Sequence, residues 1–132
     1  MFKGKKVLVL GLAKSGKAAV ELLKFMHADI TINESKKKED IPEYDTYVSE
    51  GIEMVCGGQP DELFERDFDF VVKNPGINYH APFILRLKER GIPVYTEIEL
   101  GYKVAKKQHY IAVTGTNGKT TTVTLIYEIL KA

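Results

Sequence analysis

The stretch Lys6-Val7-Leu8-Val9-Leu10-Gly11-Leu12-Ala13-Lys14-Ser15-Gly16 decides the fold of this chain of 132 residues. Its first part, residues 6–10, is an apolar run of the kind that is buried in a parallel sheet. A glycine turn follows, and Ser15 is predicted to cap a helix whose apolar residues 19, 22, 23 and 26 share one face. A strand that turns directly into an amphipathic helix indicates an α/β fold.

The same alternation continues along the chain. Further strands are predicted at residues 29–33, 53–56, 69–73 and 92–95. Helices are predicted at residues 61–65, between Pro82 and Gly91, and from a capping box at Thr96–Glu99 towards Ala105. Residues 34–50 are polar and give no prediction. Because strands and helices alternate, we expect a Rossmann-like, doubly wound parallel sheet with right-handed crossovers.

A second strand, turn and helix is predicted at residues 110–130. Residues 110–113 are apolar and predicted to form a buried strand, Gly115-Thr116-Asn117-Gly118-Lys119-Thr120-Thr121 follows, and residues 123–130 are predicted to be helical. Glycines allow backbone N–H groups to approach a phosphate, and a helix N-terminus attracts it. Lys119 would add a positive charge, and the Thr120 hydroxyl could bind Mg²⁺.

This loop departs from the general P-loop pattern, which would place its first glycine where Val113 stands. A plain turn between a strand and a helix is the alternative. Only one helix follows the loop, whereas a P-loop domain needs further strands and an Asp for the metal. We therefore expect a Rossmann-like domain at residues 1–107 and the incomplete start of an ATPase domain at residues 108–132, in a chain that is a fragment.

Composition excludes several classes of protein. Nineteen basic and eighteen acidic residues give a net charge of +1, so charge does not favour nucleic acid or membrane partners. No segment approaches the roughly 20 apolar residues that span a bilayer. The single cysteine, Cys56, cannot form an internal disulfide, and we expect a buried thiol in a cytoplasmic protein. The three histidines have no metal-ligand spacing.

Three segments should meet at the carboxyl edge of the first sheet, where such folds bind ligands. They are residues 11–16, 33–36 and 73–77. In the first, Ala13 replaces the middle glycine of the dinucleotide fingerprint, which makes close approach of a pyrophosphate harder. In the second, Glu34 lies where a dehydrogenase would hold a ribose. A nucleotide site is therefore predicted, and a nicotinamide-dependent oxidoreductase remains an alternative.

Together these residues resemble the Mur ligases of peptidoglycan synthesis over the whole chain. The motifs that carry the resemblance are residues 6–12 with Ser15-Gly16, Asn74-Pro75-Gly76-Ile77, Glu97-Ile98-Glu99-Leu100 and residues 115–121. The chain is most similar to the members that add D-glutamate. Asn74 stands where many members carry Ser, and Glu34 where some carry Asp, but both positions remain polar.

The resemblance implies an ATP-dependent acid–D-amino-acid ligase. ATP would phosphorylate the carboxylate of UDP-N-acetylmuramoyl-L-alanine, and the amine of D-glutamate would attack the acyl phosphate. By the same resemblance, the UDP-substrate site consists of Lys14, Ser15, Gly16, Glu34, Ser35, Lys36, Asn74, Pro75 and Gly76. Residues 115–121 would bind ATP, with Lys119 as the catalytic residue and Thr120 as a ligand of Mg²⁺.

Other functions remain open beside this one. A Mur ligase of different amino-acid specificity would carry the same motifs. A non-catalytic nucleotide sensor would account for two phosphate-binding loops. It would not need the Lys119-Thr120 pair, which favours the handling of a Mg²⁺-bound nucleotide. The whole enzyme is expected to be a monomer. The 132-residue chain is expected to be inactive alone, and to self-associate or be mobile beyond Gln108.

Overall fold

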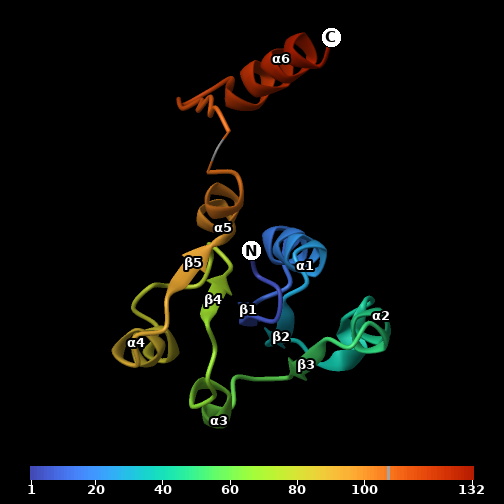
Figure 1. The fold of residues 1–132 in the computed structure, drawn as a ribbon, viewed down its shortest axis with the longest axis vertical. Helices are drawn as coiled ribbons and strands as arrows, with labels where there is room; N and C mark the ends of the chain where they lie inside the picture. The colour runs from blue at the N-terminus through green and yellow to red at the C-terminus, as the bar shows by residue number, and fades with distance from the viewer. Residues whose placement is uncertain (107) are drawn as a thin grey trace.

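A computed structural model describes residues 1–106 and 108–132 of the chain (Figure 1). Five parallel strands form one sheet in the order β3-β2-β1-β4-β5. The strands are β1 (Lys6–Leu10), β2 (Asp29–Glu34), β3 (Glu53–Cys56), β4 (Phe70–Lys73) and β5 (Val94–Thr96). The predicted α/β class and parallel sheet are thus confirmed. The fifth strand begins two residues later than predicted.

Helices cover both faces of the sheet. The helices are α1 (Lys14–Phe25), α2 (Tyr44–Ser49), α3 (Asp61–Phe64), α4 (Pro82–Glu89), α5 (Glu97–Val104) and α6 (Lys119–Lys131), with a 3₁₀ turn η1 (Lys38–Asp40) before α2. Buried side chains of α1, α2 and α5 pack on one face, and those of α3 and α4 pack on the other. The first five helices therefore complete a doubly wound domain.

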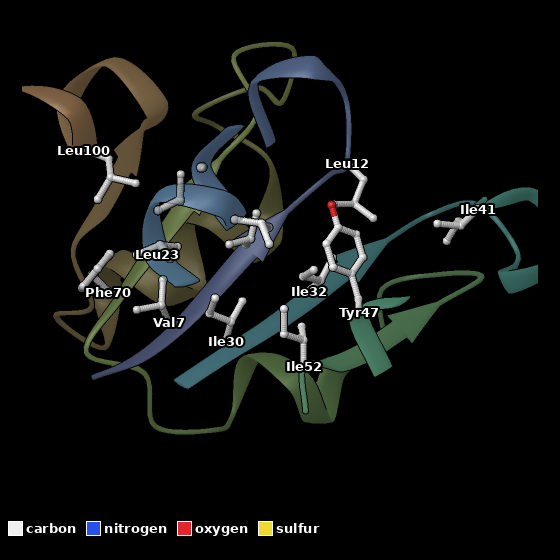
Figure 2. Packing of buried hydrophobic residues seen from close by; sticks show 14 residues of the cluster. Val7, Leu12, Leu23, Ile30, Ile32, Ile41, Tyr47, Ile52, Phe70 and Leu100 are labelled. Carbon is white, nitrogen blue, oxygen red and sulfur yellow. The ribbon is translucent and has the colours of Figure 1, made fainter. Parts of the chain in front are cut away.

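The apolar run of β1 supplies both halves of the core, because neighbouring side chains on a strand point to opposite faces. Val7 and Val9 pack with α1, α2 and α5, in the cluster that Figure 2 shows. Leu8 and Leu10 pack with α3 and α4. All four side chains have no exposed surface. A continuous apolar strand at the centre of the sheet is what buries both layers of helices.

The start of α1 differs from the prediction that Ser15 caps it. The helix begins at Lys14 with Ala13 as its N-cap, and no side chain caps it. The amide of Lys17 donates to the carbonyl oxygen of Ala13 at 3.0 Å, so Ser15 lies inside the first turn. The capping box of α5 is confirmed, since Thr96 and Glu99 bond each other reciprocally.

Helix α2 lies in the polar stretch for which no element was predicted. It is six residues long, too short for helical periodicity to be recognised. Tyr47 is its buried residue, and the ring packs with Ile32 and Ile52 against β2 (Figure 2). A single buried aromatic side chain thus fixes this helix to the sheet.

The predicted strand at residues 110–113 is wrong. These residues form no strand, and the side chains of Tyr110 and Ile111 are 52% and 64% exposed. The physical reason is that a strand needs a neighbour for its hydrogen bonds, and no described segment pairs with this one. The helix predicted after it is confirmed as α6, which lies apart from the sheet in Figure 1.

Helix α6 has no buried residue. Its apolar side chains Val123, Leu125, Tyr127, Ile129 and Leu130 are each at least half exposed. In the described part of the chain, no helix combines the length and the apolar character needed to cross a membrane.

Candidate functional site

A cavity of about 300 Å³ opens at the carboxyl edge of the sheet. It lies where the chain reverses its direction of winding, between the loops that follow β1 and β4. Its lining residues are Gly11, Leu12, Ala13, Asn33, Glu34, Ser35, Lys36, Gln59, Asn74 and Ile77. This is the edge at which open α/β sheets bind ligands, as the sequence predicted.

The cavity includes about half of the residues predicted for the UDP substrate. Glu34, Ser35, Lys36 and Asn74 line it. The others lie beside it along the chain but do not line it: Lys14, Ser15, Gly16, Pro75 and Gly76. The five that lie outside the cavity remain predictions as ligand contacts.

Gly16 has a clear packing role. A Cβ atom at this position would lie 2.0 Å from the carbonyl oxygen of Gly11, which no real side chain tolerates. Helix α1 therefore packs directly on the turn that follows β1. Gly11 itself has φ +87°, and its amide donates to the carbonyl oxygen of Asn33 at 2.9 Å. The turn is fixed to both its helix and the neighbouring strand.

The carboxylate of Glu34 anchors the same turn. It is 8% exposed, and it accepts hydrogen bonds from the amide of Leu12 at 2.7 Å, from the amide of Lys36 at 3.2 Å and from the Ser35 hydroxyl at 3.1 Å. Burial by itself would raise the pKa of this carboxyl, but the hydrogen bonds together outweigh it and lower the pKa below its usual 4.5. Glu34 is therefore a carboxylate that holds two loops together.

The opposite wall is the turn after β4. The Asn74 side-chain oxygen accepts a hydrogen bond from the amide of Gly76 at 2.9 Å, and the Asn74 amide donates to the Leu10 carbonyl at 3.0 Å. Lys73 is 2% exposed, its ammonium donates to the Ile77 carbonyl at 2.8 Å, and it lies 4.0 Å from the centre of the Tyr79 ring. A buried lysine thus holds this turn closed.

One lining residue, Gln59, lies outside the three predicted segments, and Asn33 lies in the predicted segment 33–36 but was not assigned to the UDP-substrate site. Asn33 ends β2 and donates to the carbonyl oxygens of Val55 at 3.0 Å and Gly58 at 2.7 Å. Gln59 follows Gly57-Gly58, where positive φ angles of +80° and +158° reverse the chain after β3. A pair of glycines at the end of a predicted strand was the available signal for this loop.

The second predicted phosphate loop lies at the start of α6. Gly118 has φ +78° and precedes the helix, and residues 115–121 are all exposed. The ammonium of Lys119 donates to the carbonyl oxygen of Gly115 at 2.6 Å, within the loop itself. Within residues 1–106 and 108–132, no group of three His, Cys, Asp or Glu side chains could hold a metal ion. The phosphate-binding role of residues 115–121 therefore remains a prediction.

A family model matches most of the chain. Residues 5–96 match the family model described as Mur ligase MurD-like, N-terminal domain. The chain is 49% identical over 131 residues to a protein of Streptococcus agalactiae named UDP-N-acetylmuramoylalanine--D-glutamate ligase. The match covers 99% of this chain and 29% of that protein, so the chain spans less than a third of the relative's length.

Solved structures agree with the family model. A pseudomurein peptide ligase type C from Methanothermus fervidus is 28% identical, with a TM-score of 0.63 over 97% of this chain and 26% of that one. The UDP-N-acetylmuramate-alanine ligase from Thermotoga maritima is 25% identical, with a TM-score of 0.61 over 96% of this chain and 29% of that one.

Proposed function

The chain belongs to the MurD-like Mur ligases by its match over residues 5–96, and from this we propose that residues 1–107 hold the uridine nucleotide of a peptidoglycan precursor. The observation that carries the proposal is the cavity at the carboxyl edge of the sheet. Its volume of about 300 Å³ suits a ligand of nucleoside size, at the lower end of the range for small-molecule sites. Lys36 would bring a positive charge to a diphosphate.

The geometry also bears on the nicotinamide alternative. In a dinucleotide fold, an acid after the second strand holds the ribose hydroxyls. Here the Glu34 carboxylate bonds the amides of Leu12 and Lys36, and Ala13 narrows the approach of a pyrophosphate to the turn. Both features bear on UDP as well as on NAD, and it is the family match over residues 5–96 that favours a uridine nucleotide.

In the whole protein we propose an ATP-dependent ligase that joins D-glutamate to UDP-N-acetylmuramoyl-L-alanine. The D-glutamate specificity rests on the name of the streptococcal relative, so a different amino acid would leave the nucleotide site unchanged. The reaction consumes ATP, and together with the free thiol of Cys56 this favours the cytoplasm.

Residues 108–132 would contribute to the ATP site. The N–H groups at the start of α6 and the ammonium of Lys119 would hold the phosphates, and the Thr120 hydroxyl would be one ligand of Mg²⁺. Bound Mg²⁺ would neutralise charge on the transferring phosphoryl group. We propose that the remaining ligands of the ion are contributed by the rest of the whole protein.

Calorimetric titration of this chain with UDP, NAD and ATP tests the nucleotide site. We expect UDP to bind with modest affinity, because the whole substrate would also contact other domains, and NAD to bind more weakly or not at all. Ala13→Glu puts a negative charge on the cavity wall and should abolish UDP binding. Ala18→Glu makes the same change on the exposed side of α1 and is the control. Binding of NAD in preference to UDP would contradict the proposal.

The ATP loop is tested in the whole protein with Lys119→Ala. We expect ligation to fall by about 10²-fold or more, because a charge that stabilises the transferring phosphoryl group is lost. The affinity for the UDP substrate should stay nearly unchanged, since Lys119 does not line the cavity. An enzyme that kept full activity would show that this loop does not bind the reacting nucleotide.

A further inference from the structure

Lys73, the last residue of β4, carries a buried positive charge next to the cavity. The residue is 2% exposed, and its ammonium donates to the carbonyl oxygens of Ile77 at 2.8 Å and of Asn74 at 3.4 Å. Both of these residues line the cavity, whereas Lys73 itself does not. The charge therefore lies directly behind the wall that the turn after β4 forms.

No carboxylate neutralises this charge. None of the ion pairs formed within residues 1–106 and 108–132 includes Lys73. The ammonium instead lies 4.0 Å from the centre of the Tyr79 ring, whose face attracts a cation most strongly when both are desolvated. Carbonyl oxygens and an aromatic ring carry only partial charges, so they stabilise the ammonium without cancelling its charge. A buried charge that is not neutralised acts on its surroundings with little screening by water.

The ionisable side chains that line the cavity do not by themselves favour an anion. They are Glu34 and Lys36, which carry opposite charges. The Glu34 carboxylate is buried and Lys36 is exposed, so water screens the lysine more than the carboxylate. An anionic ligand at this wall therefore needs a further positive charge to offset Glu34.

We propose that Lys73 supplies this charge and makes the cavity select for an anionic ligand, acting through the turn at residues 74–77 without touching the ligand. This role rests on the proposed function, in which the ligand carries a diphosphate. It makes Lys73 a residue that distinguishes a nucleotide from its uncharged nucleoside. Opposite unit charges on the order of 10 Å apart, at an effective dielectric constant of about 20, attract each other enough to change an affinity about tenfold.

The test measures the affinities of the 132-residue chain for UDP and for uridine by NMR titration. Uridine is the same nucleoside without the charged groups, so the ratio of its dissociation constant to that of UDP reports the preference for the anion. Lys73→Gln removes the charge and keeps an N–H donor for the Ile77 carbonyl. We expect the ratio to fall about tenfold in this variant.

Lys88→Gln is the matched control. Lys88 lies 4.9 Å from the centre of the same Tyr79 ring, but it is exposed, so the same change of charge is screened by water. The ratio should stay within about twofold of the wild-type value.

The ratio separates an electrostatic role from a structural one, because a loosened turn would weaken both ligands equally. If Lys73→Gln leaves the ratio unchanged, or if Lys88→Gln lowers it as much, the inference is overturned and the UDP site stands. If wild-type protein binds neither ligand, both the inference and the proposed function are overturned.

A measurement on wild-type protein covers the case in which Lys73→Gln does not fold. The NMR signals of Lys73 Cε and Nζ should move when UDP binds, because the charge of the ligand acts on the ammonium, and stay in place with saturating uridine. Equal shifts with both ligands would contradict the proposal.

Discussion

The chain contains two glycine turns that lead into helices, and they differ in what holds them. The turn at residues 11–16 follows the central strand of a five-stranded sheet and is fixed by its own helix, by β2 and by the Glu34 carboxylate. The turn at residues 115–118 follows an exposed segment and is fixed by one lysine that bonds its own loop. Similar local sequences therefore differ in the contacts that hold them, because only one has a sheet beside it.

The difference between the two turns predicts that the largest loss of unfolding free energy comes from substituting a glycine of the first turn. Gly16→Ala would force a Cβ atom to within 2.0 Å of the Gly11 oxygen, so α1 or the turn must move. We expect a loss of about 3 kcal/mol of unfolding free energy, typical of overpacking in a tight core. Gly118→Ala is the matched control, because its Cβ meets nothing within 4 Å although its φ is +78°.

Urea unfolding measures both variants. Gly118→Ala should strain only the start of α6 and leave the unfolding transition of the sheet domain unchanged. Equal destabilisation by the two substitutions would contradict the difference between the turns.

A second prediction concerns the two carboxylates Glu34 and Glu128. Glu34→Gln should cost about 2 kcal/mol at pH 7, because hydrogen bonds to a buried charged group are lost or weakened. Glu128 is exposed on α6, and Glu128→Gln should cost almost nothing.

The pH dependence of the Glu34 effect follows from its pKa. The folded-state pKa is lowered, so the stabilisation is fully present above the usual value of 4.5 and is lost as the pH falls through the folded-state pKa. The difference between wild-type and Glu34→Gln should therefore shrink below pH 4.5. A difference that stays constant from pH 7 to pH 3 would show that the charge is not what stabilises the turn.

Much of the first region could be predicted from the sequence, because its local patterns agree with its tertiary contacts. The apolar run of residues 6–10, the Pro82 helix start and the Thr96 capping box all lie where the patterns placed them. Short α2 could not be predicted, since one buried side chain, Tyr47, holds it in place.

The errors have physical causes as well. Residues 110–113 have the composition of a strand, but strand formation depends on a partner that composition does not reveal. At the site, the sequence identified the edge of the sheet and Glu34. It did not show that the Glu34 carboxylate accepts hydrogen bonds from backbone amides, because those contacts depend on how the loops close around it.

The smallest predicted effect is that of removing residues 107–132. The described part of this segment has no buried residue in its helix, so the unfolding free energy of the sheet domain should change by less than about 0.5 kcal/mol. Sedimentation of both chains tests the accompanying prediction that only the longer one self-associates, through the exposed apolar side chains of α6. A large loss of stability on truncation would mean that the segment packs on the sheet.

The most direct test of the comparison is amide hydrogen exchange, measured residue by residue by NMR with and without saturating UDP. We expect β1, β2 and β4 to exchange only through global unfolding and residues 110–113 to exchange freely. UDP should slow exchange further at Leu12 and Lys36, whose amides bond Glu34 beside the cavity, and leave residues 115–131 unchanged. Protection that was uniform along the chain, or UDP protection confined to residues 115–121, would contradict the account.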